Sequence, residues 1–469
     1  MKFKNIIISA GLLISFVACE RKLDLLPQQE LDENIVFDNP ATTYAALLGV
    51  YSTTQTLDFY GSLPQVIAEY MGDNVEFIGT FPTLQDLNDF SAVSTNSNVA
   101  IIWRMHYQVV TRANKIIANV PNVEGLDDGT KAQYIAEAKF LRALAFFQLA
   151  NLYAHPYQVD NGENLAVPIV LDEFTTEVTY PSRNTLNEVH AQIKQDLEEA
   201  IPDLLVEFET SSETRGRATK GAAYALLSRL HLYREEWPEA VAAAENVLNQ
   251  GIYDLASNYS FYNGNTSEDV FTIQNSAVDN GRTGSGGWAA YYMPASEGGR
   301  GDAPFSQSLI DAFESEPGDA RFNLKMEGET AGIEYYFNTK FPDAVNNSDH
   351  SPVIRVTEVY LNLAEALAHM STTPDAEAVR ILNEELRDRA GLGLKEVTTQ
   401  EELIDALLIE RRKELAFEGH RRMDMLRNRQ DLRVGNPDAA FGGDKTILPI
   451  PQREIDNNPG LQGQQNNGY

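Results

Sequence analysis

An apolar stripe with the period of an α-helix most constrains how this chain can fold. From Tyr134, apolar or small residues follow in steps of three and four, at Ala138, Leu141, Ala145, Leu149 and Leu152. This spacing places them on one face of a helix. The helix should end at His155-Pro156, because the residue before a proline disfavours helical dihedrals. The pattern predicts a scaffold of packed helices.

A helical hairpin is predicted in the middle of the chain. One helix runs from about Lys220 to Arg234, and the next starts at Trp237-Pro238 and runs through Asn249. Proline suits the first turn of the second helix, and Gly251 lies just past its end. The segment KGAAYALLSRLHLYREEWPEAVAAAENVLNQGIYDL resembles a tetratricopeptide (TPR) repeat, whose period is about 34 residues. A plain helix hairpin fits the pattern almost as well.

Two more helices are predicted in the last third. The first begins at Ser351-Pro352, with serine as N-cap and proline at the first helical position, and the second covers Glu401 to about Gly419. Segments with little periodicity lie between the helices, notably at 60–98 and 252–349. We therefore expect a mostly α fold, a single helical body over 41–469 whose long irregular excursions carry the binding residues.

The N-terminus has the layout of a secretory signal peptide over residues 1–18. Two lysines precede an apolar run from Ile6 to Val17, shorter than the ~18 to 20 residues that a membrane-spanning helix needs. Cys19, the only cysteine in 469 residues, follows directly after the small residue Ala18. FVAC resembles the bacterial lipobox, although Phe16 stands where leucine is usual. We expect a lipid anchor at Cys19 and a polar tether over 19–40; an unlipidated signal peptide with an incidental cysteine is the alternative.

Acidic side chains dominate the charge of the mature chain. Without the two lysines of the leader, 35 basic side chains face 68 acidic ones, a net charge of −33. Such a chain repels polyanions. Nucleic-acid binding is therefore disfavoured, and so is attraction to an anionic membrane surface without the lipid.

Five stretches resemble the SusD/RagB family: RALAFFQLANLYAHPY at 142–157, IRVTEVYLNLAEALAH at 354–369, ILNEELRDRAGLG at 381–393, LLIERRKELAFEGHRRMDMLR at 407–427 and LPIPQREIDNNPGLQGQQNNGY at 448–469. With the lipobox, they span nearly the whole chain. The resemblance implies an outer-membrane lipoprotein with a mostly α-helical, TPR-containing fold. It also implies a SusC-like TonB-dependent transporter as partner, and non-catalytic capture of oligosaccharides, or of peptides or other nutrients, at the cell surface.

The charged motif ERRKELAFEGHRR is interpreted as scaffold. Glu410, Glu414 and Glu418 are spaced i, i+4 and i+8. Ion pairing on one helix face is expected with arginines three or four positions away, namely Arg411, Arg421 and Arg422. As a glycosidase pair, Glu410 and Glu418 would be about 12 Å apart on a helix, beyond the ~5 to 9.5 Å used in glycoside hydrolysis.

No metal or cofactor is expected. The seven histidines form no HExxH motif or i, i+4 pair, and no glycine-rich phosphate loop follows a strand. DAVNNSDH at 343–350 offers oxygen ligands for calcium, but it lacks the spacing of an EF-hand and is more typical of a solvated loop.

The first candidate for ligand contact is GRTGSGGWAAYYMPASEGGRGDAP at 281–304. It holds seven glycines around Trp288, Tyr291 and Tyr292. Aromatic rings on such a loop can stack on the apolar faces of sugar rings. Two interpretations of Trp288 stand: it is a platform for a sugar, or it fills the core while the glycines let the loop pass.

A second candidate patch surrounds EYMGDN at 69–74. Its candidate ligand contacts are Tyr60, Phe77, Phe81, Asp73 and Asn74. Family members commonly carry ligand contacts in the corresponding excursion, while burial of these aromatics explains them equally well. Trp103 and Trp237 are interpreted as core residues.

Two other functions compete with glycan capture. One is a secreted glycoside hydrolase that uses some of the many carboxylates, and the other is a scaffold whose TPR-like hairpins hold only proteins. Activity on a panel of glycans would reveal the hydrolase. Transporter binding without saccharide binding would favour the scaffold.

Overall fold

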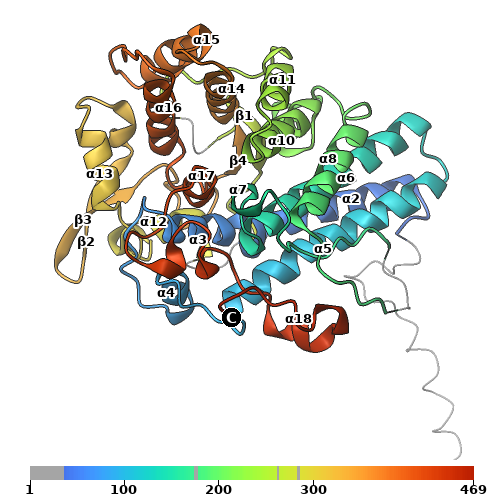
Figure 1. Ribbon diagram of the computed structural model, residues 1–469. Helices are drawn as coiled ribbons and strands as arrows, with labels where there is room; N and C mark the ends of the chain where they lie inside the picture. The colour runs from blue at the N-terminus through green and yellow to red at the C-terminus, as the bar shows by residue number, and fades with distance from the viewer. Residues whose placement is uncertain (1–35, 174–177, 261–263, 282–285) are drawn as a thin grey trace, which may run out of the picture.

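The computed structural model describes residues 36–173, 178–260, 264–281 and 286–469. Long helices form a continuous series in which each packs on the next (Figure 1). The series comprises α2 (Pro40–Thr54), α5 (Ser97–Asn119), α6 (Asp128–Tyr153), α8 (Leu186–Ala200), α10 (Lys220–Tyr233), α11 (Trp237–Leu248), α14 (Val356–Met370) and α16 (Gln400–Leu415). The expected mostly α fold is confirmed.

Shorter elements fill the spaces between these helices. The described strands form two separate two-stranded sheets: β1 (Asp269–Ile273) with β4 (Ser351–Arg355), and β2 (Lys325–Thr330) with β3 (Ile333–Asn338). The short α- and π-helices are η1 (Leu57–Gly61), α3 (Leu63–Met71), α4 (Pro82–Asn88), α7 (Tyr157–Asp160), α9 (Ser211–Gly216), α12 (Trp288–Tyr292), α13 (Gln307–Glu314), α15 (Ala376–Arg380), η6 (Ile381–Arg387), α17 (Arg421–Arg427) and α18 (Gln452–Asn457).

Local signals in the sequence place the ends of the long helices. The side chain of Asp127 caps α6 by accepting from the Thr130 amide, and Thr399 with Glu402 forms a capping box on α16. The α10–α11 hairpin lies within one residue of the predicted bounds. Gly221 lets α10 pack closely, because a Cβ there would lie 2.3 Å from the Tyr253 hydroxyl.

Tertiary pairing overturns two of the predicted boundaries. Ser351 and Pro352 do not start a helix, because residues 351–355 form the buried strand β4, which pairs antiparallel with β1. The following helix starts at Val356. The predicted helix to Gly419 ends at Leu415, since Phe417 and Gly419 adopt positive φ angles of 69° and 84°. Glu418 therefore lies outside the helix.

The first predicted excursion is only partly irregular. Every residue of α3 is buried, so this part of 60–98 belongs to the core. The exposed part runs from about Glu76 to Pro82. The second excursion, 252–349, carries β1, α12, α13 and the β2–β3 hairpin.

The three motif glutamates form ion pairs, but with cations of other elements. Glu410 accepts from Arg321 and Arg387, each at 2.6 Å. Glu414 and Glu418 are also almost fully buried. Their partners within 4 Å are Arg321, Lys340, Arg355 and Arg389. The cluster thus joins segments far apart in the sequence, which agrees with the scaffold interpretation of the motif. The ion pairs run between elements and not along one helix face.

The arginines of the motif are engaged elsewhere, contrary to the expected pairing on one face. Arg411 pairs with Asp424 at 2.8 Å, and Arg421 pairs with Asp73 at 2.5 Å. Arg422 donates to the backbone carbonyls of Thr446 and Asn151. The helix ends at Leu415, so Arg421 and Arg422 belong to α17, whereas Arg411 lies within α16 and is paired with Asp424 of α17.

The pH dependence of unfolding tests this cluster. Burial raises the pKa of Glu414, but the neighbouring arginines outweigh it and lower the pKa to about 2, below the ordinary 4.5. Ionised Glu414 therefore stabilises the fold above about pH 4.5, and this stabilisation is lost as the pH falls toward 2. We expect the free-energy difference of unfolding between wild type and Glu414→Gln to be constant from about pH 7 to 4.5 and to shrink below. A difference that grows on acidification would contradict the ion pairing.

Candidate functional site

A guanidinium lies between two aromatic rings on the surface near α4 and α12. The Arg300 Cζ lies 4.1 Å from the ring centroid of Phe81 and 4.5 Å from that of Tyr291. Phe81 is 51% exposed, whereas Tyr291 is buried. We call Phe81, Tyr291, Arg300 and the adjacent Asp302 the Arg300 site. It joins the two patches that the sequence analysis treated separately.

Backbone pairing brings these segments together. The Ile78 amide donates to the Asp302 carbonyl at 2.8 Å, and the Glu76 amide donates to Pro304. On the other side, the Phe305 amide donates to Tyr336 of β3 at 2.8 Å. Gly79 permits this close approach, because a Cβ there would lie 2.7 Å from the Asp302 carboxyl carbon. Backbone hydrogen bonds therefore hold segment 76–79, segment 300–305 and strand β3 side by side.

The charges at the site are partly compensated. Arg300 Nε donates to Asp302 Oδ2 at 2.6 Å, while Nη2 is buried without a hydrogen-bond partner. The Arg300 side chain is only 9% exposed. The pKa of the Tyr291 hydroxyl is raised, first by burial and then by the charges of Asp58 and Asp302, with Arg300 opposing. Tyr291 thus faces one guanidinium and two carboxylates.

This arrangement suits binding through an aromatic ring. One face of Phe81 rests on the guanidinium, which holds the ring by a cation–π contact. More than half of the side chain is open to solvent, so it offers an apolar ring for a flat, partly apolar ligand. A ring held in place loses little freedom on binding, which favours affinity.

The other aromatic candidates of the glycine-rich segment lie in the core. Trp288 is fully buried, and its Nε1 donates to the Phe417 carbonyl at 3.0 Å. Tyr292 is also fully buried, against Phe417 at a ring-centroid distance of 5.3 Å. The burial of Trp288 agrees with the core interpretation and corrects the platform interpretation, because helix α12 turns the indole inward and leaves no ring face to solvent.

Four candidates of the other patch are engaged by other groups of the protein. Tyr60 is buried. Asp73 pairs with Arg421, and the buried Asn74 bridges Arg412 and Glu69. Phe77 is half-buried against Tyr70, with ring centroids 4.8 Å apart. In this patch, Phe81 is the candidate whose ring is open to solvent.

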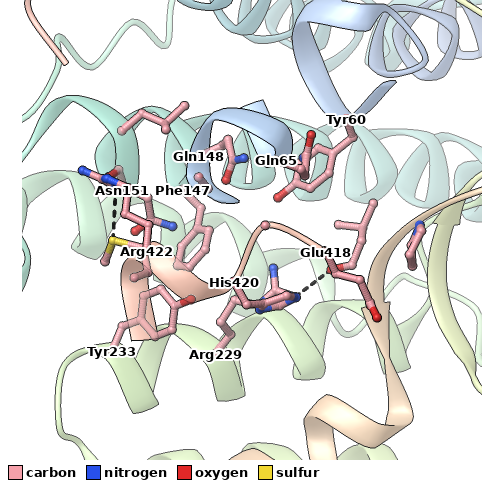
Figure 2. A pocket seen from close by; sticks show the side chains of 16 residues that line it. Tyr60, Gln65, Phe147, Gln148, Asn151, Arg229, Tyr233, Glu418, His420 and Arg422 are labelled. Atoms are coloured by element: carbon pink, nitrogen blue, oxygen red, sulfur yellow. Dashed lines mark hydrogen bonds between the residues drawn. The ribbon is translucent and has the colours of Figure 1, made fainter. Parts of the chain in front are cut away.

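A polar cavity lies inside the molecule between α3, α6, α10 and α17 (Figure 2). Tyr60, Gln65, Arg229 and His420 contribute to its lining, and its volume is about 40 Å³. At roughly 10 to 15 Å³ for each water, it has room for about three water molecules. The cavity is therefore too small for a sugar ring.

Comparison with known proteins identifies the family. Residues 330–469 match the model of the SusD family, and residues 23–232 match a model described as starch-binding associating with outer membrane. A SusD-like protein of Formosa agariphila is 25% identical over the full length of both chains. The chain belongs to the SusD/RagB family.

Solved structures support the same assignment for this SusD/RagB protein. A SusD superfamily protein from Bacteroides thetaiotaomicron is 26% identical with a TM-score of 0.81, covering 91% of this chain and 99% of the other. A laminarin-binding SusD-like protein is 25% identical with a TM-score of 0.74, covering 92% of this chain and all of the other.

The sequence analysis did not identify Arg300, Asp302 or Asp58 as candidates for ligand contact. Arg300 and Asp302 lie inside the glycine-rich segment at 281–304. The two opposite charges of Arg-Gly-Asp, which follow two glycines, could have indicated an ion pair in this loop. Asp58 lies in η1, and its pKa is raised by burial. Local sequence does not show that Phe81 and Arg300 meet, since backbone pairing of distant segments brings them together.

None of the helices in the described ranges is both long and apolar enough to cross a membrane. In the same ranges, no group of three or more His, Cys, Asp or Glu side chains is placed to hold a metal ion. In the loop 343–350, Asp343 accepts hydrogen bonds from Asn346 and Ser348. Cys19 lies outside the described residues.

Proposed function

We propose that this SusD/RagB protein is a non-catalytic, lipid-anchored binding protein of the outer membrane, which captures glycans and delivers them to a SusC-like TonB-dependent transporter. The observation that carries the proposal is the half-exposed Phe81 ring held on Arg300. The family's description as starch-binding and the laminarin-binding structural relative support a glycan as ligand.

The binding step follows from the geometry of the Arg300 site. A sugar ring could stack its apolar C–H face on the open side of the Phe81 ring. The hydroxyl groups of the sugar would then stay bonded to water or to nearby polar groups of the protein. Arg300 lies against the ring and is bonded to Asp302, so these polar groups are close to the place where the hydroxyls would lie. Peptide capture in the same type of complex is the second candidate. The laminarin-binding relative and the starch-binding family description favour a glycan.

Replacing Phe81 is the direct test of the platform. We expect Phe81→Ala to weaken binding of a recognised glycan about five- to 150-fold, which corresponds to about 1 to 3 kcal/mol of lost stacking and burial. Stability should change little, because the ring is half-exposed. Isothermal titration calorimetry and urea denaturation on the same variant measure both quantities.

Tyr180 provides a matched control for this variant. It is 53% exposed and lies in a segment that contacts the C-terminal region, where Gly460 approaches its carbonyl. Tyr180→Ala removes a similar exposed ring and should leave glycan binding unchanged. Unchanged binding by a folded Phe81→Ala variant would remove Phe81 from the site.

The lipid anchor is tested by replacing Cys19. The thiol is the atom to which a diacylglycerol would be linked, so Cys19→Ala should move the protein out of the outer-membrane fraction. Several acyl chains bury many CH₂ groups at ~0.8 kcal/mol each, which makes release of the anchored protein negligible. Cell fractionation with immunodetection measures the shift, and a variant that stays in the membrane fraction would contradict the anchor.

A further inference from the structure

We propose that two adjacent cavities in the core hold a chain of ordered water molecules bound by Gln65 and His190. The larger cavity is the one between α3, α6, α10 and α17, with a volume of about 40 Å³ (Figure 2). The smaller cavity has a volume of about 10 Å³ and is lined by residues of α6, α7, α8 and α17. Asn151, Tyr233 and Met423 line both, so the two cavities lie side by side.

The first of the two binding side chains, Gln65, lies on α3 and lines the larger cavity (Figure 2). Only 3% of it is exposed, and neither its amide nitrogen nor its amide oxygen has a hydrogen-bond partner among the described residues. A buried amide left unbonded lowers stability, and buried polar groups are almost always bonded to protein or to water. Water satisfies both atoms, because it donates and accepts.

The second binding side chain, His190, lies on α8, lines the smaller cavity and is 4% exposed. Burial, and then the charge of Arg234, lower its pKa to about 3, so the ring is neutral at pH 7. Arg234 Nη1 lies 3.3 Å from His190 Nδ1, and a guanidinium only donates, so Nδ1 is the acceptor. The proton is therefore on Nε2, a buried donor without a partner in the described part of the chain.

The cavities have the size and the polar lining that water needs. At roughly 10 to 15 Å³ for each water, the larger holds about three molecules and the smaller about one. Gln148 and Asn151 add side-chain amides to the lining of the larger cavity, and each amide can donate and accept. Asn151 lines the smaller cavity too, which allows the waters to form one connected chain.

The charges of the lining favour a neutral guest over an ion. Arg229 donates to Glu358 at 2.6 Å, and Glu418 pairs with a buried arginine at 2.9 Å, so both charges are engaged. Burial lowers the pKa of His420 to about 4, so this ring is neutral at pH 7. Arg422 donates to backbone carbonyls, which makes an anion beside Arg422 the competing occupant.

The water chain joins α3 to the series of long helices. Gln65 belongs to α3, whereas Asn151 and His190 belong to α6 and α8. Helix α3 ends at Met71, shortly before the segment 76–81 that carries Phe81. The waters therefore bridge the helical scaffold and the helix that leads into this segment.

A high-resolution crystal structure of the full mature chain, with crystals soaked in sodium bromide, tests the occupancy. We expect water density within hydrogen-bond distance of the Gln65 amide and of His190 Nε2, and no anomalous bromide signal in either cavity. Nitrogen NMR of protein with labelled histidine should place the His190 proton on Nε2. Dry cavities, a bromide peak beside Arg422, or a proton on Nδ1 would each overturn the proposal.

The variant Gln65→Met gives opposite signs for a hydrated and a dry cavity. Methionine has nearly the volume and the helix propensity of glutamine, so the change acts mainly on hydrogen bonding. If water is bound, the variant removes its hydrogen bonds to Gln65, and Tm should fall by about 1 to 4 °C. If the cavity is dry, the variant removes an unbonded amide from the core, and Tm should rise.

Gln195→Met is the matched control for this measurement. Gln195 lies exposed on α8, so the same replacement there should shift Tm by less than about 1 °C. Differential scanning calorimetry measures both variants. A Tm of Gln65→Met that is equal to or above that of the control would overturn the proposal.

Discussion

Replacing Trp288 with alanine is expected to lower the free energy of unfolding by about 3 to 5 kcal/mol. The indole is among the largest fully buried side chains and packs on Phe341 with ring centroids 4.8 Å apart. The variant also leaves the Phe417 carbonyl without the donor that holds the turn after α16. Urea denaturation followed by circular dichroism measures the loss.

Trp237→Ala is the control for removing an indole. Trp237 is half-buried at the start of α11 and stacks on His369 at 4.2 Å. Trp237→Ala should lower the free energy of unfolding by about 1 to 2 kcal/mol, because it removes less buried apolar surface than Trp288→Ala does. If Trp288→Ala were as stable as wild type and had lost glycan binding, the core assignment of Trp288 would be wrong.

Glu410→Ala is expected to lower the free energy of unfolding by about 3 to 5 kcal/mol, because it leaves buried cations without their partner. Arg321 and Arg387 each contact the Glu410 carboxylate at 2.6 Å, and Arg321 is almost fully buried. Glycan binding by the fraction that folds should be unchanged, since Glu410 is held by Arg321 and Arg387, neither of which belongs to the Arg300 site. Chemical denaturation and calorimetry measure the two properties separately.

A surface glutamate provides the comparison for Glu410. Glu384 lies 3.6 Å from Arg380, and its side chain is 66% exposed. Exposed pairs contribute about 0 to 1 kcal/mol, so Glu384→Ala should barely change stability. A Glu410→Ala variant with wild-type stability and no ligand binding would instead give Glu410 a direct role in the site.

Several predictions from the sequence depend on signals that lie close together in the chain. The apolar period from Tyr134 to Leu152 and the proline at 156 predicted α6, which ends at Tyr153. Pro238 predicted the start of α11, and Gly251 predicted its end. These signals act within one or two turns of a helix, so no tertiary information is needed to interpret them.

Other predictions failed where partners distant in the sequence compete with local preference. Ser351-Pro352 is a good helix start, yet pairing with β1 makes it a strand. The glutamates of α16 were spaced for pairs within the helix, yet buried arginines from other elements are their partners. A buried carboxylate takes the cations that the fold brings to it, whatever its spacing along the helix.

The sequence by itself determined the helical class, the helical hairpin, the family and the aromatic candidates for ligand contact. Only the tertiary structure decided which of these aromatics face solvent. Trp288 and Phe81 both lie in excursions between long helices, but Trp288 turns into the core and Phe81 rests on Arg300 at the surface. Exposure depends on what packs against a side chain, and that is set by contacts between segments far apart in the chain.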